Sequence, residues 1–265
     1  NFGPFLFQPA EFMKLAIIFY LASWYDKRQQ HLHDLYYGFL PILTIVLLVS
    51  GLIILQPDFG TMSVLVAIAA SMFFIAGTKL KYLFSLAGIS GLVMYILVKA
   101  EPYRLSRITT FFDPGHDAKG ISYQINQALI GIGSGGLWGL GFGQSRQKYN
   151  YLPEPIGDSI FAIMSEELGF IRVSIVLILF LFLAIRGFRV AMKAPETFGK
   201  MVAAGITSWL VFQALINIGG IIALIPLTGI PLPFISYGST AMVINLAAVG
   251  ILLNISRYSN STRNA

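Results

Sequence analysis

The sequence predicts an all-α polytopic membrane protein, and its composition is the first reason. Of the 265 residues, 56% are hydrophobic and only 11% are charged, whereas soluble domains carry about 25% charged residues. The mean hydropathy is +0.73. One soluble core of this size cannot bury so much apolar surface, so much of it is expected to face lipid. The absence of cysteine excludes disulfides and thiolate metal sites.

The second reason is the length of the apolar runs. A helix that crosses a bilayer needs about 20 mostly apolar residues. Seven runs meet or approach this length and predict seven transmembrane helices: 10–25, 38–55, 60–77, 82–99, 158–185, 201–225 and 235–255. The first is short, but Pro9 is a favourable first residue of a helix. Because the chain starts at Asn1 without an initiator Met or a signal peptide, we expect a fragment of a longer protein.

The basic residues are concentrated in alternate loops, after the first, third, fifth and seventh predicted spans. They are Lys27, Arg28, Lys79, Lys81, Arg186, Arg189, Lys193, Lys200, Arg257 and Arg263. The connections at 56–60 and 226–234 carry no Lys or Arg. The positive-inside rule therefore predicts an external N-terminus and a cytoplasmic C-terminus. This distribution explains the net charge of +6 better than nucleic-acid binding does.

Residues 100–157 are predicted to form one long extracytoplasmic loop. The loop contains five basic residues, which is compatible with the outside because long loops escape the charge rule: Arg104, Arg107, Lys119, Arg146 and Lys148. Loops of this length are usually functional or disordered. The apolar run 125–132 predicts that parts of this loop form helices embedded in the membrane.

Asp158 is the acid with the strongest case for chemistry. Two prolines and a glycine in the 151–157 segment precede it, so a helix is expected to start at or near Asp158. One interpretation is a helix N-cap. The other is a carboxylate at the membrane–water boundary, where the helix N-terminus favours the anion and apolar surroundings disfavour it. These opposing effects could tune a general base.

Three other acids, Glu11, Glu166 and Glu167, have structural interpretations that compete with functional ones. Glu166 and Glu167 are five or six residues from Arg172, a poor same-helix spacing, so a buried ion network with partners on other helices is expected. Glu11 and Lys14 are three apart and share a helix face. They predict a local ion pair, unless Lys14 points at an anionic ligand.

The remaining polar motifs favour structural explanations. Asp58 lies in a turn and is expected to cap the next helix. The 131–136 segment fits GxGxxG, but without a preceding strand a dinucleotide site is rejected, and close helix packing and a turn explain these glycines better. No Walker A motif is present. His116 with Asp113 and Asp117 could hold a divalent cation, although a turn followed by a cap is the simpler interpretation.

Several motifs, in order along nearly the whole chain, resemble the shape, elongation, division and sporulation (SEDS) family, which includes FtsW and RodA. They are Gln8-Pro-Ala-Glu11 with Lys14, Gln56-Pro-Asp-Phe-Gly60, Gly133-Ser-Gly-Gly-Leu137, Gly143-Gln-Ser-Arg-Gln-Lys148, Tyr151-Leu-Pro-Glu154, Asp158 to Phe161, Glu166-Glu-Leu-Gly169 and Pro231-Leu-Pro-Phe-Ile-Ser-Tyr-Gly238. The stretch 143–148 looks more like the FtsW branch. Leu6, Arg172 and Ser239 depart from residues common in the family.

The resemblance implies a single SEDS transmembrane domain over 1–265, part of a ten-span fold with three spans before Asn1. It also implies peptidoglycan glycosyltransfer: polymerisation of lipid II into glycan strands at the outer face of the bacterial cytoplasmic membrane, here for septal synthesis in cell division. The implied partners are a class B penicillin-binding protein and other divisome membrane proteins. The family's proposed catalytic Asp corresponds to Asp158.

The chemistry of such a transfer fits the residues. A sugar hydroxyl needs a base, and the leaving pyrophosphate needs positive charge. The substrate-binding candidates are Lys14, Glu11, Arg104, Arg107, Arg146, Lys148 and Glu154. A divalent cation, Mg²⁺ or Mn²⁺, could assist, and its ligands are left unassigned. A lipid II flippase, or a non-catalytic divisome scaffold, remains an alternative.

Overall fold

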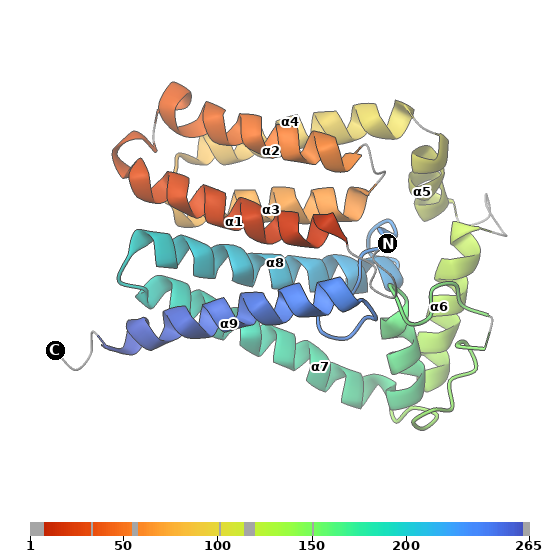
Figure 1. Ribbon diagram of the computed structural model, residues 1–265. Helices are drawn as coiled ribbons and strands as arrows, with labels where there is room; N and C mark the ends of the chain where they lie inside the picture. The colour runs from red at the N-terminus through yellow and green to blue at the C-terminus, as the bar shows by residue number, and fades with distance from the viewer. Residues whose placement is uncertain are drawn as a thin grey trace. The chain divides into compact units, whose positions relative to one another are not determined.

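The computed structural model describes residues 8–32, 34–54, 58–100, 102–113, 120–149 and 151–261. Within these ranges the chain is helical and has no strand (Figure 1). The α-helices are α1 Pro9–Lys27, α2 Leu40–Ile54, α3 Phe59–Ile75, α4 Leu80–Ala100, α5 Pro102–Phe112, α6 Ile121–Gly135, α7 Ile160–Lys193, α8 Thr197–Ile221 and α9 Ser239–Ser261. The short helices η1 (Gln29–His31) and η2 (Leu35–Phe39) connect α1 to α2.

Each of the seven predicted spans coincides with a helix, which confirms the all-helical, multi-pass membrane architecture. Four helical segments of the described chain are long and apolar enough to cross a membrane: Leu35–Ile53, Ile160–Lys193, Thr197–Ile221 and Ser239–Tyr258. Two more apolar helices, Phe59–Ile75 and Leu80–Ile96, are shorter. A count of seven membrane crossings therefore stays a prediction. The predicted long loop contains α5 and α6, as its apolar run indicated.

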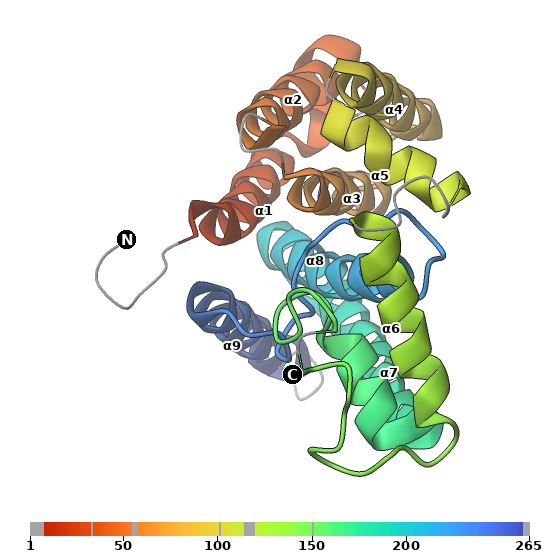
Figure 2. The same ribbon diagram turned by 90° about the vertical axis from the view of Figure 1, so that its right-hand side faces the viewer.

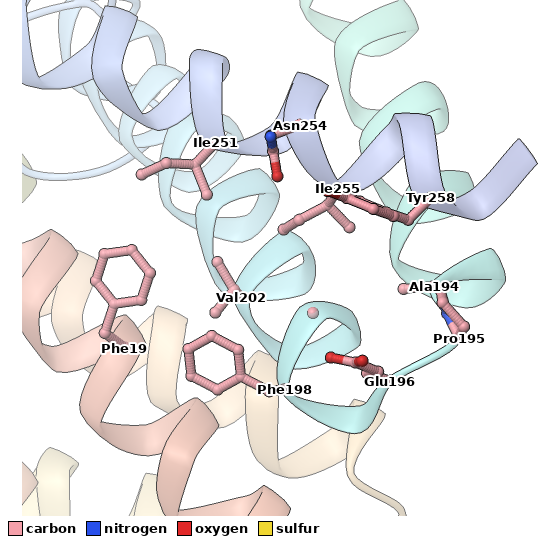
Figure 3. A pocket seen from close by; sticks show the side chains of 11 residues that line it. Phe19, Ala194, Pro195, Glu196, Phe198, Val202, Ile251, Asn254, Ile255 and Tyr258 are labelled. Carbon is pink, nitrogen blue, oxygen red and sulfur yellow. The ribbon is translucent and has the colours of Figure 1, made fainter. Parts of the chain in front are cut away.

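The chain divides into two compact units, which are described separately. The first comprises Asn1–Leu92, Phe182–Phe212 and Ser239–Ala265. Its described core contains fully buried Ile18, Leu65 and Met72. Gly205 is packed against Ile18 and Met72, so a larger residue there would force these side chains to move. A pocket of about 310 Å³ in this unit has walls that include Phe19, Phe198, Val202 and Ile251 (Figure 3). None of the predicted site residues lines it.

The second unit comprises Val93–Leu181 and Gln213–Gly238. Its core is formed by apolar residues of α6, the start of α7 and the end of α8, among them Ile125, Ala128, Phe161, Ala162, Ala214 and Ile221. Helices α6 and α7 lie side by side (Figure 2). A Cβ atom at Gly135 would overlap the carbonyl oxygen of Ser165, so the contact requires glycine. The prediction that glycines in this region serve close helix packing is confirmed.

Helix α7 is interrupted at Gly169, whose φ of 75° and ψ of 172° are not helical. The residues after α6 replace the broken helical hydrogen bonds. The N–H groups of Leu140 and Gly141 donate to the carbonyls of Glu166 (2.9 Å) and Glu167 (3.0 Å). In the opposite direction, the N–H groups of Phe170 and Ile171 donate to the carbonyls of Gly136 (2.9 Å) and Leu137 (3.2 Å). Hydrogen bonds to the segment after α6 therefore stabilise the break in α7.

Two predicted helix starts are confirmed. Helix α1 begins at Pro9, where the missing N–H of proline would have no helical partner in any case. Asp58 caps α3: its side chain accepts hydrogen bonds from the N–H of Thr61 at 2.9 Å and the Thr61 hydroxyl at 2.7 Å. Helix α9 begins at Ser239, four residues later than predicted, because residues 226–238 form an irregular loop.

Candidate active site

Asp158 lies in the second unit, two residues before α7, at the end of a segment whose backbone is held tightly. The Ile156 carbonyl accepts a hydrogen bond from the Tyr237 N–H at 2.8 Å. The Gly157 carbonyl accepts one from the Ser236 hydroxyl at 2.7 Å. The loop that follows α8 thus fixes the two residues that precede Asp158. Because these contacts involve backbone carbonyls, they leave the Asp158 side chain available for chemistry.

Asn217 on α8 completes this support. Its side-chain amide donates to the backbone carbonyls of Asp158 at 2.8 Å and Ile230 at 2.7 Å. Asn217 is almost completely buried, so the two hydrogen bonds are shielded from water. One side chain therefore ties the candidate base to the loop opposite it. Asn217 was not among the predicted site residues, although a polar side chain between two isoleucines near the end of α8 is a signal in the sequence.

The Asp158 carboxylate is half-buried and lies beside Gly229 and the guanidinium of Arg107. A Cβ atom at Gly229 would lie 3.4 Å from Asp158 Oδ2 and 3.9 Å from Arg107 Nη2. The φ of Gly229 is +73°, a conformation that favours glycine. The loop therefore brings a side-chain-free residue next to the carboxylate, which keeps space open around its oxygens.

The environment raises the pKa of Asp158 above its ordinary value. Burial is the main cause, and the negative charge of Glu154 adds to it. The backbone N–H groups of Asp158 and Ser159 and the positive charge of Arg107 act in the opposite direction and lower this pKa. This balance of opposing effects is the one that the sequence analysis expected for a general base.

Of the two interpretations of Asp158, the N-cap is wrong. Helix α7 begins at Ile160, so Ser159 is the residue immediately before it. Ser159 is buried; its hydroxyl donates to the Pro153 carbonyl at 3.0 Å and accepts a hydrogen bond from the Gln124 side chain at 3.1 Å. Ser159 thus fixes the entry to the helix.

Arg107 on α5 holds the loop opposite Asp158. Its Nη1 donates to the backbone carbonyls of Leu227 and Thr228, each at 3.1 Å. The two N–H groups on this one nitrogen can serve both carbonyls. Arg107 was predicted to be a substrate-binding residue. In the structure it contacts the protein's own loop and also acts electrostatically on Asp158.

Glu166 and Glu167 form the expected structural polar network, but their predicted partners were wrong. Glu166 accepts hydrogen bonds from the N–H groups of Arg146 (3.0 Å) and Gln147 (3.2 Å) and from the Ser145 hydroxyl. The partners lie in the 143–148 loop, not on other helices. Backbone N–H groups satisfy a buried carboxylate well, because they are fixed donors that need no second charge.

Glu167 binds the same loop from the neighbouring position. It accepts hydrogen bonds from the N–H groups of Gly143 (2.9 Å) and Ser145 (3.2 Å). Lys148 forms an ion pair with it at 2.9 Å and donates to the Gly143 carbonyl. The hydrogen bond that the Lys148 ammonium donates to Glu167 is the main reason that the pKa of Lys148 is raised. We call Glu166, Glu167 and their partners in 143–148 the loop clamp.

In the first unit, Glu11 and Lys14 form the predicted ion pair on one face of α1. The Lys14 ammonium is 2.7 Å from Glu11 Oε1, and both side chains are at most 2% exposed. The ammonium also lies over the Trp209 ring, 4.9 Å from its centre. The structure thus provides the local ion pair. A role of Lys14 toward an anionic ligand stays a prediction.

The comparisons with known proteins agree with this architecture. The family model described as "cell cycle protein", which covers FtsW, RodA and SpoVE, matches residues 1–261. The chain belongs to the FtsW/RodA/SpoVE family. The family resemblance deduced from the motifs is therefore confirmed.

Relatives within the FtsW/RodA/SpoVE family carry two kinds of name. Stage V sporulation protein E of Bacillus subtilis is 48% identical over 258 residues, which are 97% of this chain and 70% of that protein. The probable peptidoglycan glycosyltransferase FtsW of the same organism is 41% identical over 272 residues, covering 99% and 67%. That of Nitrosomonas europaea is 43% identical over 252 residues, covering 94% and 65%. The chain thus spans about two thirds of the length of these relatives.

Solved structures of this family have the same fold. A chain from a peptidoglycan synthase complex that coordinates polymerisation and crosslinking matches with a TM-score of 0.76 and 27% identity, over 98% of this chain and 72% of that one. The rod shape determining protein RodA of Thermus thermophilus matches with a TM-score of 0.65 and 27% identity, over 97% and 68%.

Three predicted site residues remain to be described: Glu154, Arg146 and Arg104. Glu154 lies near Asp158 and is exposed. Arg146 is exposed on the loop held by the clamp. Arg104 lies on α5, but its side chain is outside the described residues, as are His116 and Asp117. Within the described ranges, no group of three or more His, Asp and Glu side chains could hold a metal ion.

Proposed function

We propose that this chain is a peptidoglycan glycosyltransferase that polymerises lipid II at the outer face of the cytoplasmic membrane, with Asp158 as general base. The observation that carries the proposal is the placement of Asp158. Its backbone is fixed by α8 and the following loop, while its carboxylate is half-buried with a raised pKa. A raised pKa makes this carboxylate a stronger base than an ordinary exposed Asp, which favours its acceptance of a proton.

The reaction needs one base and one displacement. The acceptor hydroxyl of one sugar attacks the anomeric carbon of the other, and its proton passes to the Asp158 carboxylate. The new glycosidic bond forms as the bond between the anomeric carbon and the lipid pyrophosphate oxygen breaks. The pyrophosphate leaves as an anion, for which positive charge must be close. A single displacement inverts the anomeric carbon, and a covalent intermediate would require a nucleophile of its own.

Arg107 and Arg146 belong to the same unit as Asp158 and are our candidates for contact with the pyrophosphate. Arg146 is exposed, and the loop clamp fixes the backbone that carries it. A divalent cation would supply further positive charge to the leaving group. Because the described residues offer no set of three ligands, we assign no step to it.

The assembly partner we propose is a class B penicillin-binding protein that cross-links the product, together with other division membrane proteins. This proposal is supported by the likeness to a complex that coordinates polymerisation and crosslinking. Relatives named FtsW favour septal synthesis, while the relative from stage V of sporulation favours wall synthesis in spores. We propose the septal role.

A lipid II flippase is the main rival, and one observation counts against it. A flippase needs polar groups along a path across the bilayer. Glu166 and Glu167 were the candidates for such a path, but their oxygens are occupied by the loop clamp. We propose that Asp158, the remaining candidate acid, acts at the outer end of the membrane, as a polymerase requires.

The test is lipid II polymerisation by the purified protein with its partner in detergent, where no second compartment exists. We expect Asp158→Asn to abolish glycan formation. Asp34→Asn, the same change at an exposed position, should leave it intact. Glycan strands of normal length from a folded Asp158→Asn protein would overturn the proposal. If the unmodified protein makes no polymer but moves lipid II across the membrane of vesicles, the protein is a flippase.

A further inference from the structure

We propose that the Gly136–Phe142 turn, between α6 and the 143–148 loop, is inserted into the lipid bilayer and that Arg172 binds an anionic phospholipid headgroup beside it. The turn lies against the break of α7 at Gly169 and exposes large apolar side chains. It has no part in the proposed chemistry of Asp158, so the two proposals stand or fall separately.

The exposure of this turn is the first observation. Leu137 is 60% exposed, Trp138 68% and Phe142 90%. The neighbouring residues of α7 continue the surface, with Phe170 67% and Ile171 41% exposed. Apolar surface so concentrated on a short irregular segment marks an interaction site with a membrane or another protein.

Much of the backbone of the turn is hydrogen-bonded within the protein, as burial in a membrane requires. Non-helical backbone is tolerated at membrane depth only if its polar groups are bonded within the protein. Here the N–H groups of Leu140 and Gly141 and the carbonyls of Gly136 and Leu137 are bonded to α7. The Trp138 carbonyl accepts from Arg172 Nη1 at 3.0 Å. Exposed apolar side chains on a backbone satisfied in this way suit lipid better than water.

The length of α7 places the turn at the edge of the hydrocarbon core. After the break, α7 is apolar over 170–185 apart from Arg172 and Ser174, up to the basic residues that begin at Arg186. At about 1.5 Å per residue this stretch is about 24 Å long. The hydrocarbon core is about 30 Å thick. Residues next to Gly169, against which the turn packs, would extend this stretch toward the full thickness of the core.

The surface of the turn is continuous with the lipid-facing side of α7. Ile175, Ile178 and Leu179 are all more than half exposed, and the most apolar window of α7 is only 11% buried. The outer residues of a helix that crosses a membrane face acyl chains. Trp138 at the end of this surface has the position that Trp favours at membrane interfaces.

Arg172 identifies the lipid chemistry. Helical side chains lean toward the N-terminus, so Arg172 extends from its place on α7 back toward the turn and bonds the Trp138 carbonyl. That bond uses one of the five N–H donors of the guanidinium. The other donors are then at the level where phospholipid phosphates lie. A cation there favours an anionic headgroup such as phosphatidylglycerol.

The chain has no cysteine, which makes site-directed spin labelling direct. Phe142→Cys, labelled with a nitroxide, is reconstituted in nanodiscs of phosphatidylethanolamine and phosphatidylglycerol. We expect the label to collide more often with oxygen than with a water-soluble nickel chelate, as a label at Ile178→Cys should. A label at Gln144→Cys, exposed on the neighbouring loop, should show the opposite preference. Leu137→Cys provides a second position in the turn.

Two outcomes overturn the insertion. Labels at 137 and 142 that prefer the nickel chelate, as at 144, place the turn in water. Labels shielded from both reagents place it in a protein contact. For Arg172, phosphatidylglycerol binding measured by native mass spectrometry should weaken about fivefold in Arg172→Gln and be preserved in Arg172→Lys. If Arg172→Gln binds phosphatidylglycerol as well as Arg172→Lys does, the assignment of Arg172 to the headgroup is overturned.

Discussion

The guanidinium of Arg107 and the carboxylate of Asp158 both lie against Gly229, one residue of a loop that Arg107 itself holds. Arg107 therefore affects Asp158 in two ways. Its charge favours the ionised carboxylate. Its hydrogen bonds fix the loop that faces the carboxylate. Substitutions can separate these two effects.

Arg107→Gln removes the charge that lowers the pKa of Asp158, so the pKa should rise further above its ordinary value. A general base works only when ionised, so activity is lost as the pH falls through this pKa. We expect the acid limb of the pH–rate profile to move to higher pH. The profile of polymerisation rate by the purified protein against pH measures this shift.

Two variants control for the interpretation. Glu154→Gln removes a negative charge that raises the pKa of Asp158, so its acid limb should move in the opposite direction, to lower pH. Arg107→Lys keeps the charge but replaces the guanidinium that contacts the loop by an ammonium on a different stem. It should lower kcat and leave the acid limb near that of the unmodified protein. If all three variants share one acid limb, Asp158 is not the group being titrated.

Asp158 should also reduce the stability of the protein at neutral pH. Because the folded-state pKa is raised, the folded protein binds this proton more tightly than the unfolded chain does. The stabilisation from protonation is complete below the unfolded pKa and is lost as pH rises through the folded pKa. Asp158→Asn, which is never charged, should therefore have a higher Tm than the unmodified protein at pH 7 while losing activity.

Thermal unfolding at several pH values checks this expectation. The difference in Tm between the two proteins should shrink as the pH is lowered, because Asp158 then becomes neutral in both states. Asp34→Asn, at a position 61% exposed, should not show this pattern. An Asp158→Asn protein less stable than the original at pH 7 would show that the carboxylate contributes structure rather than chemistry.

The sequence was informative where a local pattern has a local cause. The predicted span 60–77 corresponds to α3, Phe59–Ile75. The cap of α3 by Asp58 could be predicted because a cap and its helix are adjacent in the chain. The pairing of Glu11 with Lys14 followed from their three-residue spacing. Asp158 could be selected because prolines and a glycine precede it.

Contacts between distant parts of the chain could not be predicted from these patterns. Nothing in the spacing of Arg107 indicates that its partners are Leu227 and Thr228, 120 residues away. Glu166 was expected to contact another helix, yet it accepts hydrogen bonds from the N–H groups of a loop. Every residue except proline has a backbone N–H group, so the sequence does not indicate which of them will bind a carboxylate. The break at Gly169 also depends on a distant segment, residues 136–141, to replace its hydrogen bonds.

The loop clamp makes a prediction about stability. Glu166→Gln replaces one carboxylate oxygen by an amide nitrogen, which cannot accept a hydrogen bond, so buried donors in 145–147 lose a partner. We expect a loss of about 1–3 kcal/mol in the free energy of unfolding. Lys148→Gln breaks only a partly exposed ion pair and should cost less stability than Glu166→Gln does. Hydrogen exchange at the 143–148 amides, which should accelerate in Glu166→Gln but not in Lys148→Gln, locates the effect.

Asn217 makes the last prediction, which concerns position rather than charge. Asn217→Ala removes both hydrogen bonds that tie the backbone of Asp158 to Ile230. Two buried carbonyls lose a donor, so about 1–3 kcal/mol of stability should be lost. Because the base is then displaced, kcat should fall more than KM rises. The control is Asn245→Ala, an equally buried Asn on α9, which should lower stability without changing kcat. If the two variants reduce activity only in proportion to the folded fraction, Asn217 supports the fold and has no separate part in positioning Asp158.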